Sequence, residues 1–205
     1  MKNILLASSS PRRVELLQHA GLRFEPLPIN FPEDIETNSL DAFSSAGELA
    51  ESNARKKLMY ALSKISAYGI VLCADTVVAV EGEILGKPVN GDDAARMLGL
   101  LSGREHIVCT GVALTDTTSA DVVSFHETTR VMFRELSPVE IRRYIATSEP
   151  FDKAGAYGIQ EKASVFVESI SGCYSNVVGL PVARLIEVLR DKMRLDVTRY
   201  WEEKK

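Results

Sequence analysis

The sequence has few of the residues that mark disulfide-rich or zinc-binding proteins. It contains three cysteines and three histidines. Cys73, Cys109 and Cys173 are widely separated, and the histidines follow no ligand spacing, so we expect neither a disulfide framework nor a His-based metal site. This pattern indicates reduced thiols in a cytoplasmic protein.

Long apolar runs and an excess of basic residues are also missing. No window approaches the roughly 20 apolar residues of a membrane span, and we expect no targeting segment. The formal net charge is −4, so no overall positive field points to DNA or RNA. We therefore expect no membrane partner and no nucleic-acid partner. To bind a polyanion, such a chain must gather its cations at one place.

The residues that are present predict one globular unit over residues 1–205, with 45% hydrophobic and 25% charged residues. Hydrophobic periodicity predicts strands at 3–7, 24–29, 70–74, 77–80, 83–85 and 165–170, and a long hairpin over 104–134. It predicts helices at 11–20, about 38–65, 92–101, 138–147 and 179–189. Alternating strands and helices with inserted hairpins indicate the α/β class, with a mixed sheet and flanking helices.

The stretch LLASSSPRR, residues 5–13, has the layout of an anion site. Ser10 is a suitable helix N-cap and Pro11 a suitable first helical residue, which places Arg12 and Arg13 in the first turn. Cations there oppose the helix dipole, and a bound anion would offset this. The alternative is a capped helix with two solvated arginines, and this segment alone does not decide between them.

The stretch CADTVVAVEGEILGKP, residues 73–88, places Asp75 where the strand 70–74 is predicted to end. That is the usual place for catalytic groups in open α/β sheets. A carboxylate there can hold a divalent metal or activate a water, and Thr76 can hydrogen-bond a ligand. The alternative is a turn aspartate that caps nearby amides. Lys87 by itself fits a solvated lysine.

Three further charged residues have two interpretations each. Lys57 stands on the long helix, one turn from Ala54 and Ala61, at the rim of the apolar face. Its ammonium can reach solvent or point into a cleft. Glu33 and Asp34 lie in a loop, where they can bind Mg²⁺ or simply keep the loop soluble.

The stretch DKAGAYGIQ, residues 152–160, contains two alanines and two glycines between Lys153 and Gln160. Such small residues indicate backbone brought close to another group. The Gln160 amide has donors and an acceptor, enough to read the edge of a nucleobase. The alternative is a glycine-containing loop that leads into a strand.

Six motifs together resemble the Maf family of nucleoside triphosphate pyrophosphatases: LASSSPRRVELL, ADTVV, GEILGKP, LSGREHIVCTGVAL, EPFDKAGAYGIQ and GLPV. The resemblance covers residues 4–189 and leaves 190–205 as a C-terminal tail. It implies an inosine triphosphate pyrophosphatase-like (Maf-like) fold with two lobes around a cleft. Because the family is often dimeric, it also implies a homodimer.

The resemblance implies hydrolysis of a nucleoside triphosphate to the monophosphate and pyrophosphate, by metal-assisted attack of water at the α-phosphate. It assigns Asp75 as general base and metal ligand, and Lys57 and Lys87 as catalytic cations in the same cleft. The implied phosphate-binding residues are Ser8, Arg12 and Arg13. Glu33 is the implied second metal ligand, although Pro32 before it departs from the family pattern and leaves Asp34 as an alternative. Oxygen ligands without His or Cys suit Mg²⁺ or Mn²⁺.

Thr76 and Gln160, together with Arg13, resemble the subfamily that acts on dTTP and UTP, with modified pyrimidine nucleotides as further candidates. The subfamily that acts on 7-methyl-GTP carries another residue after the aspartate and an acidic residue near Gln160. Three alternatives stay open: a pyrophosphatase for 7-methyl-GTP, one for noncanonical purines, or a nucleotide-binding regulator of septum formation and cell division.

Overall fold

The computed structural model describes residues 3–32, 44–119 and 121–201. The strands are β1 (Ile4–Ala7), β2 (Phe24–Leu27), β3 (Ile70–Val80), β4 (Glu83–Leu85), β5 (Glu105–Asp116), β6 (Val122–Phe133) and β7 (Val167–Ser171). The helices are α1 (Pro11–His19), α2 (Ala46–Leu62), α3 (Gly91–Leu101), α4 (Pro138–Ile145), α5 (Tyr174–Val178) and α6 (Val182–Asp191). Short 3₁₀ helices are η2 (Glu149–Asp152), η3 (Ala154–Ala156), η4 (Lys162–Phe166) and η5 (Val197–Trp201).

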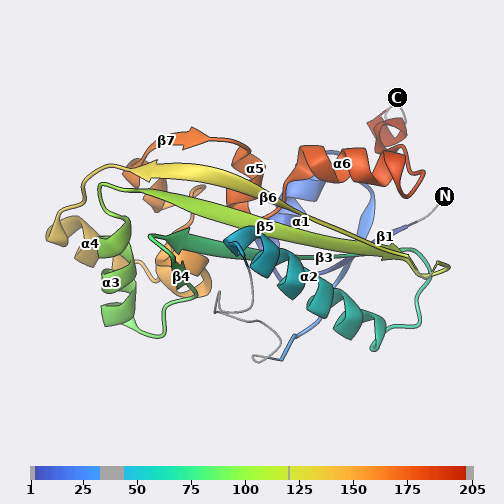
Figure 1. Cartoon of the computed structure of the whole chain (residues 1–205), viewed down its shortest axis with the longest axis horizontal. Helices are drawn as coiled ribbons and strands as arrows, with labels where there is room; N and C mark the ends of the chain where they lie inside the picture. The colour runs from blue at the N-terminus through green and yellow to red at the C-terminus, as the bar shows by residue number, and fades with distance from the viewer. Residues whose placement is uncertain (1–2, 33–43, 120, 202–205) are drawn as a thin grey trace.

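The strands form one mixed sheet in the order β2-β1-β3-β5-β6-β7, with β4 paired to β3 (Figure 1). β1 runs parallel to both β2 and β3, whereas β3, β5, β6 and β7 pair antiparallel to one another. The long β5–β6 hairpin turns between Asp116 and Val122, as its sequence predicts. The prediction of an α/β fold with a mixed sheet and flanking helices is therefore confirmed.

Alternation along β3 separates the two faces of the sheet. Val71 and Cys73 pack against α2 on one face, while Ile70 and Leu72 pack with α1 and α6 on the other. A further core cluster contains Phe133 together with residues of α3 and α4. Figure 1 shows these two helices at the opposite end of the long strands. The two ends of the sheet thus carry separate apolar clusters, which form the two lobes.

The predicted end of a strand at Ala74 is wrong. β3 continues without a break to Val80, because β5 pairs with it from Ile70 to Ala79. Asp75 and Thr76 therefore lie inside a strand, opposite Gly111 and Thr110 of β5. The side chains of Asp75 and Thr76 can lie inside this strand because both have hydrogen-bond partners.

Several predicted boundaries also shift. α2 begins at Ala46 because the Ser45 side chain accepts a hydrogen bond from the Glu48 amide, and it ends at Leu62 rather than near residue 65. The N-terminal signal predicted at Asn38 and Asp41 lies outside the described residues.

The C-terminal part contains a helix that the sequence analysis did not predict. α5 ends at Val178 and is capped by Gly179, whose φ of 130° residues other than glycine rarely adopt. The last helix therefore begins at Val182 rather than at residue 179. The strand predicted over 165–170 begins at Val167, after the 3₁₀ helix η4.

Among the residues that the structure describes, every helix is too short or too polar to span a lipid bilayer.

Candidate active site

A cavity of about 760 Å³ opens beside the middle of β3. On the edge of β3 that faces away from β5, β1 pairs with Ile70–Leu72 and β4 pairs with Val78–Val80. Asp75 and Thr76 lie between these two paired stretches and line the cavity. The other walls are formed by the β1–α1 loop, by the residues that follow β4, by η2 and η3 themselves, and by the α5–α6 loop. The sheet topology therefore produces a cleft at the place where β1 and β4 part.

Asp75 faces α2, on the same side of β3 as Val71 and Cys73. Its Oδ1 lies 2.6 Å from Lys57 Nζ, and its Oδ2 accepts a hydrogen bond from Asn53 Nδ2 at 3.1 Å. The Asp75 and Lys57 side chains are 7% and 9% exposed. Lys57 thus points into the cleft, and the interpretation as a solvated rim lysine is wrong.

Arg13 joins three segments of the cleft wall. Its Nε donates to the Gly179 carbonyl at 2.9 Å, and its Nη1 and Nη2 donate to Ser8 Oγ and Thr76 Oγ1, each at 3.2 Å. Thr76 Oγ1 also lies 3.0 Å from Thr110 Oγ1, which donates to a carbonyl of α5. Because Thr110 uses its hydrogen there, Thr76 donates to Thr110 and accepts from Arg13. The guanidinium of Arg13 therefore links the β1–α1 loop, β3 and the α5–α6 loop.

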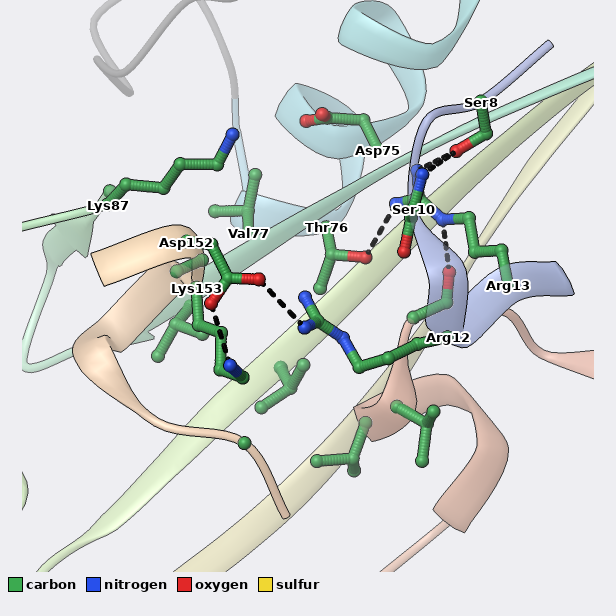
Figure 2. A pocket seen from close by; sticks show the side chains of 18 of the residues that line it. Ser8, Ser10, Arg12, Arg13, Asp75, Thr76, Val77, Lys87, Asp152 and Lys153 are labelled. Carbon is green, nitrogen blue, oxygen red and sulfur yellow. Dashed lines mark hydrogen bonds and ion pairs between the residues drawn. The ribbon is translucent and has the colours of Figure 1, made fainter. Parts of the chain in front are cut away.

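Arg12 lies on the same turn but faces across the cleft. Its Nη1 is 3.2 Å from Asp152 Oδ2, while Asp152 Oδ1 accepts from Lys153 Nζ at 2.7 Å. Figure 2 shows Arg12 and Lys153 approaching the Asp152 carboxylate from two sides. Burial raises the pKa of Asp152, but the hydrogen bond from Lys153 and the charges of Lys153 and Arg12 outweigh it and hold the pKa below its ordinary value.

The start of α1 has the features of an anion site. Ser10 occupies the N-cap position and Pro11 the first turn, but the Ser10 side chain makes no capping hydrogen bond and the first turn carries no acidic residue. Ser8 Oγ instead accepts from the Ser10 amide at 3.2 Å. The expected position of the cap is confirmed, while the expected capping bond is not formed. Helix N–H groups without a side-chain acceptor suit a bound anion.

Lys87 and Gln160 lie at the rim of the cleft, and both are exposed. Figure 2 shows the Lys87 side chain extending toward the side on which Asp75 lies. Eight predicted site residues therefore line one cavity: Ser8, Arg12, Arg13, Lys57, Asp75, Thr76, Lys87 and Gln160. Glu33 and the alternative Asp34 lie outside the described residues.

The small residues near Gln160 have a structural explanation. Lys153 is 5% exposed, and its stem passes so close to Gly158 that a Cβ there would lie 2.6 Å from Lys153 Cε. The group that the backbone approaches is therefore a lysine of the same loop. Gln160 leads into η4 rather than directly into a strand.

The structure adds Asn53, Asp152 and the structural role of Lys153 to the residues predicted from the sequence. Asn53 had a usable signal, because it stands four residues before Lys57 and shares its helix face. Asp152 had no such signal, since its partner Arg12 is 140 residues away.

The donor chemistry of the cleft suits a divalent metal bound together with phosphates. Among the residues that the structure describes, no group of three or more His, Cys, Asp and Glu side chains gathers. The described cavity wall contains two carboxylates, those of Asp75 and Asp152. Mg²⁺ in phosphate-processing sites is commonly held by one or two carboxylates plus substrate oxygens rather than by a protein cage. Asp75 fits such a site.

Cys73, two residues before Asp75, does not supply a nucleophile. Its thiol is buried in the α2 face of the sheet. Burial raises its pKa to about 12. Because the thiolate is the reactive form, this cysteine is chemically inert at neutral pH.

The mixed sheet and the cleft, with its buried carboxylate–lysine pair and the cations at the start of α1, define an α/β protein whose cleft suits an anionic ligand. A family model described as Maf-like protein matches residues 3–192, so the chain belongs to the Maf-like family.

Two curated relatives cover nearly the whole chain. A dTTP/UTP pyrophosphatase of Carboxydothermus hydrogenoformans is 50% identical over 188 residues, which is 92% of this chain and 97% of the relative. A dTTP/UTP pyrophosphatase of Bacillus cereus is 48% identical over 198 residues, which is 97% of this chain and 99% of the relative. Among solved structures, a HAM1 protein from Coxiella burnetii matches with a TM-score of 0.44 and 15% identity, covering 65% of this chain and 73% of that one.

Proposed function

We propose that the chain is a nucleoside triphosphate pyrophosphatase that hydrolyses dTTP and UTP to the monophosphate and pyrophosphate. The observation that carries the proposal is the Asp75 carboxylate, buried beside Lys57 and Asn53 in a cleft that also contains Arg12 and Lys87. Relatives named dTTP/UTP pyrophosphatase, at 50% and 48% identity, support it.

The proposed reaction is attack of water on the α-phosphate, with Asp75 as general base. Lys57 and Asn53 each contact one oxygen of the carboxylate. Each oxygen retains a lone pair, so the carboxylate can still accept a proton from water. Negative charge develops on the leaving pyrophosphate, and Arg12, Lys87 and the first turn of α1 supply compensating positive charge. This chemistry needs no covalent intermediate, in keeping with the buried Cys73.

A divalent cation, Mg²⁺ or Mn²⁺, is part of the proposal. Asp75 is the described residue that would hold it, and the resemblance adds Glu33 as a second ligand. When bound, the cation would draw electron density from the phosphate oxygens and neutralise part of their charge.

Base selection is proposed to involve Gln160 and Thr76. The exposed Gln160 amide at the rim can form hydrogen bonds to the edge of a pyrimidine. Thr76 already accepts from Arg13 and contacts Thr110. Its contribution to substrate choice would therefore act largely through the position of the Arg13 guanidinium.

A substrate panel tests the function. Purified protein is incubated with dTTP, UTP, the other canonical nucleotides, 7-methyl-GTP and noncanonical purine triphosphates, each with Mg²⁺ or Mn²⁺, and pyrophosphate and orthophosphate are measured separately. We expect pyrophosphate from dTTP and UTP at the highest kcat/KM. Orthophosphate as the product would contradict the reaction, and preference for a purine would contradict the pyrimidine assignment. Absence of hydrolysis, with binding retained, would favour the regulator of septum formation and cell division.

Two further parts of the proposal concern the cellular compartment and the oligomeric state. The free cysteines Cys73 and Cys109 are buried, which suits a reducing compartment, and we infer the cytoplasm. We also infer a homodimer from the family resemblance, and light scattering on the purified protein tests it.

A further inference from the structure

We propose that Asp152 is an internal counter-anion that holds Arg12 in the ligand-free cleft and gives it up when substrate phosphate arrives. The inference depends on the proposed function in one respect, namely that Arg12 binds phosphate. It assigns to Asp152 a role in setting how strongly the cleft binds phosphate groups.

The two oxygens of Asp152 have separate partners. Oδ1 accepts from the buried Lys153 Nζ at 2.7 Å, whereas Oδ2 accepts from Arg12 Nη1 at 3.2 Å. Charge-assisted N–H···O contacts are usually about 2.7–2.9 Å long. The contact with Arg12 is therefore the looser of the two and is the one that can be exchanged for another anion.

Lys153 keeps Asp152 in place independently of Arg12. The Lys153 side chain is 6% exposed, and its Nζ also donates to the Glu149 carbonyl at 2.8 Å and lies 3.2 Å from Glu161 Oε2. Asp152 therefore stays attached to its loop when Arg12 leaves. A fixed carboxylate at this position is a permanent competitor for the guanidinium.

The competition is weak enough to permit substrate binding. The Arg12 and Asp152 side chains are 24% and 65% exposed, and ion pairs as exposed as this contribute little. A phosphate group can instead engage a guanidinium through two parallel hydrogen bonds. A triphosphate should therefore displace Asp152 from Arg12. The affinity of the cleft for triphosphate should be about two- to fivefold lower than it would be without the Asp152 carboxylate.

The test is calorimetric titration of the full chain with inorganic triphosphate, in buffer without added divalent metal. The variants are Asp152→Asn, Asp152→Ser, Arg12→Met and the double variant Arg12→Met/Asp152→Asn. Asp191→Asn is the matched control, because Asp191 also pairs with an arginine, Arg190, but lies away from the cleft. Thermal melts verify that each variant is folded.

We expect Asp152→Asn and Asp152→Ser to lower Kd for triphosphate about two- to fivefold. Asp191→Asn should leave Kd unchanged, and Asp152→Asn should have no effect in the Arg12→Met background. An unchanged or raised Kd for both Asp152 variants would overturn the proposal. An equal gain with and without Arg12 would overturn it too, since Asp152 would then act by general repulsion. Because the readout is binding of an inorganic probe, it can fail while dTTP hydrolysis persists, and it can succeed when hydrolysis is absent.

Discussion

Lys57 Nζ lies 2.6 Å from Asp75 Oδ1, and less than a tenth of either side chain is exposed. The two residues come from different elements, the middle of α2 and the middle of β3. Removing one partner of a buried ion pair leaves the other charge without compensation, which destabilises a fold more than the intact pair stabilises it. This pair therefore connects the stability of the sheet–helix packing with the proposed catalytic group.

Lys57→Met is expected to lower the free energy of unfolding by about 3–5 kcal/mol, because it leaves the Asp75 carboxylate buried and unpaired. Asp75→Asn is expected to lower kcat by about 10²–10⁴, the usual contribution of a general base. Urea denaturation and pyrophosphate release measure the two effects.

The double variant Lys57→Met/Asp75→Asn separates the two roles of the pair. We expect it to be more stable than Lys57→Met, since no uncompensated charge remains, and yet inactive. Lys56→Met, on the exposed neighbouring position of α2, should change stability by less than about 0.5 kcal/mol. Additive stability losses in the double variant would show that Lys57 and Asp75 are not energetically coupled.

Gly111 allows α2 to approach the sheet beside Asp75. It is the register partner of Asp75 on β5, and a Cβ there would lie 2.2 Å from the carbonyl carbon of Ala50. We expect Gly111→Ala to destabilise the fold by about 1–3 kcal/mol or more, and to lower activity because it displaces the helix that carries Asn53 and Lys57. Denaturation and kinetic assays on the same preparation check both effects.

Gly99→Ala is the matched control for Gly111→Ala. Gly99 lies in α3, and a Cβ there meets no atom within 4 Å. The substitution Gly99→Ala should stabilise the fold by up to about 1 kcal/mol, because alanine has a higher helix propensity than glycine. If both variants had the same effect, the close approach of α2 at Gly111 would not be the cause.

The sequence predicted the residue types of the site better than their geometry. Ala54 and Ala61 show only which face of α2 is apolar, and they predict Lys57 at the rim of that face. Whether a lysine at that edge is solvated depends on a carboxylate in another element, and helix periodicity contains no such information. The prediction that the strand ends before Asp75 is wrong for the same reason. β3 continues past Asp75 because it pairs with β5, a strand distant in the sequence. Local signals succeeded where the cause is local: the helix predicted to begin at residue 138 does begin there, because Ser137 and Glu140 form a capping box at its start.

Gln160→Glu is expected to move substrate preference away from dTTP and UTP, because a carboxylate offers acceptors alone where the amide offers both donors and an acceptor. Loss of a hydrogen bond to the base should lower kcat/KM for the pyrimidines about 10-fold or more, in line with about 1.4 kcal/mol or more. Kinetics on the full nucleotide panel measure the shift. A uniform decrease for every nucleotide would instead indicate repulsion of the phosphates, and no change would exclude Gln160 as a specificity residue.

His106 makes the fold sensitive to acid. It is 2% exposed, and its Nε2 lies 2.8 Å from the hydroxyl of Tyr157, a residue of the cleft wall. Burial lowers the pKa of His106 from 6.5 to about 4. Between these values the unfolded chain binds a proton that the folded chain does not, so stability is full above pH 6.5 and decreases as the pH falls toward 4. We expect wild type to lose about 2–3 kcal/mol more than His106→Gln between pH 7.5 and 4.5. Urea denaturation of both proteins at the two pH values measures the difference, and equal losses would show that His106 takes up its proton in the folded chain as readily as in the unfolded one.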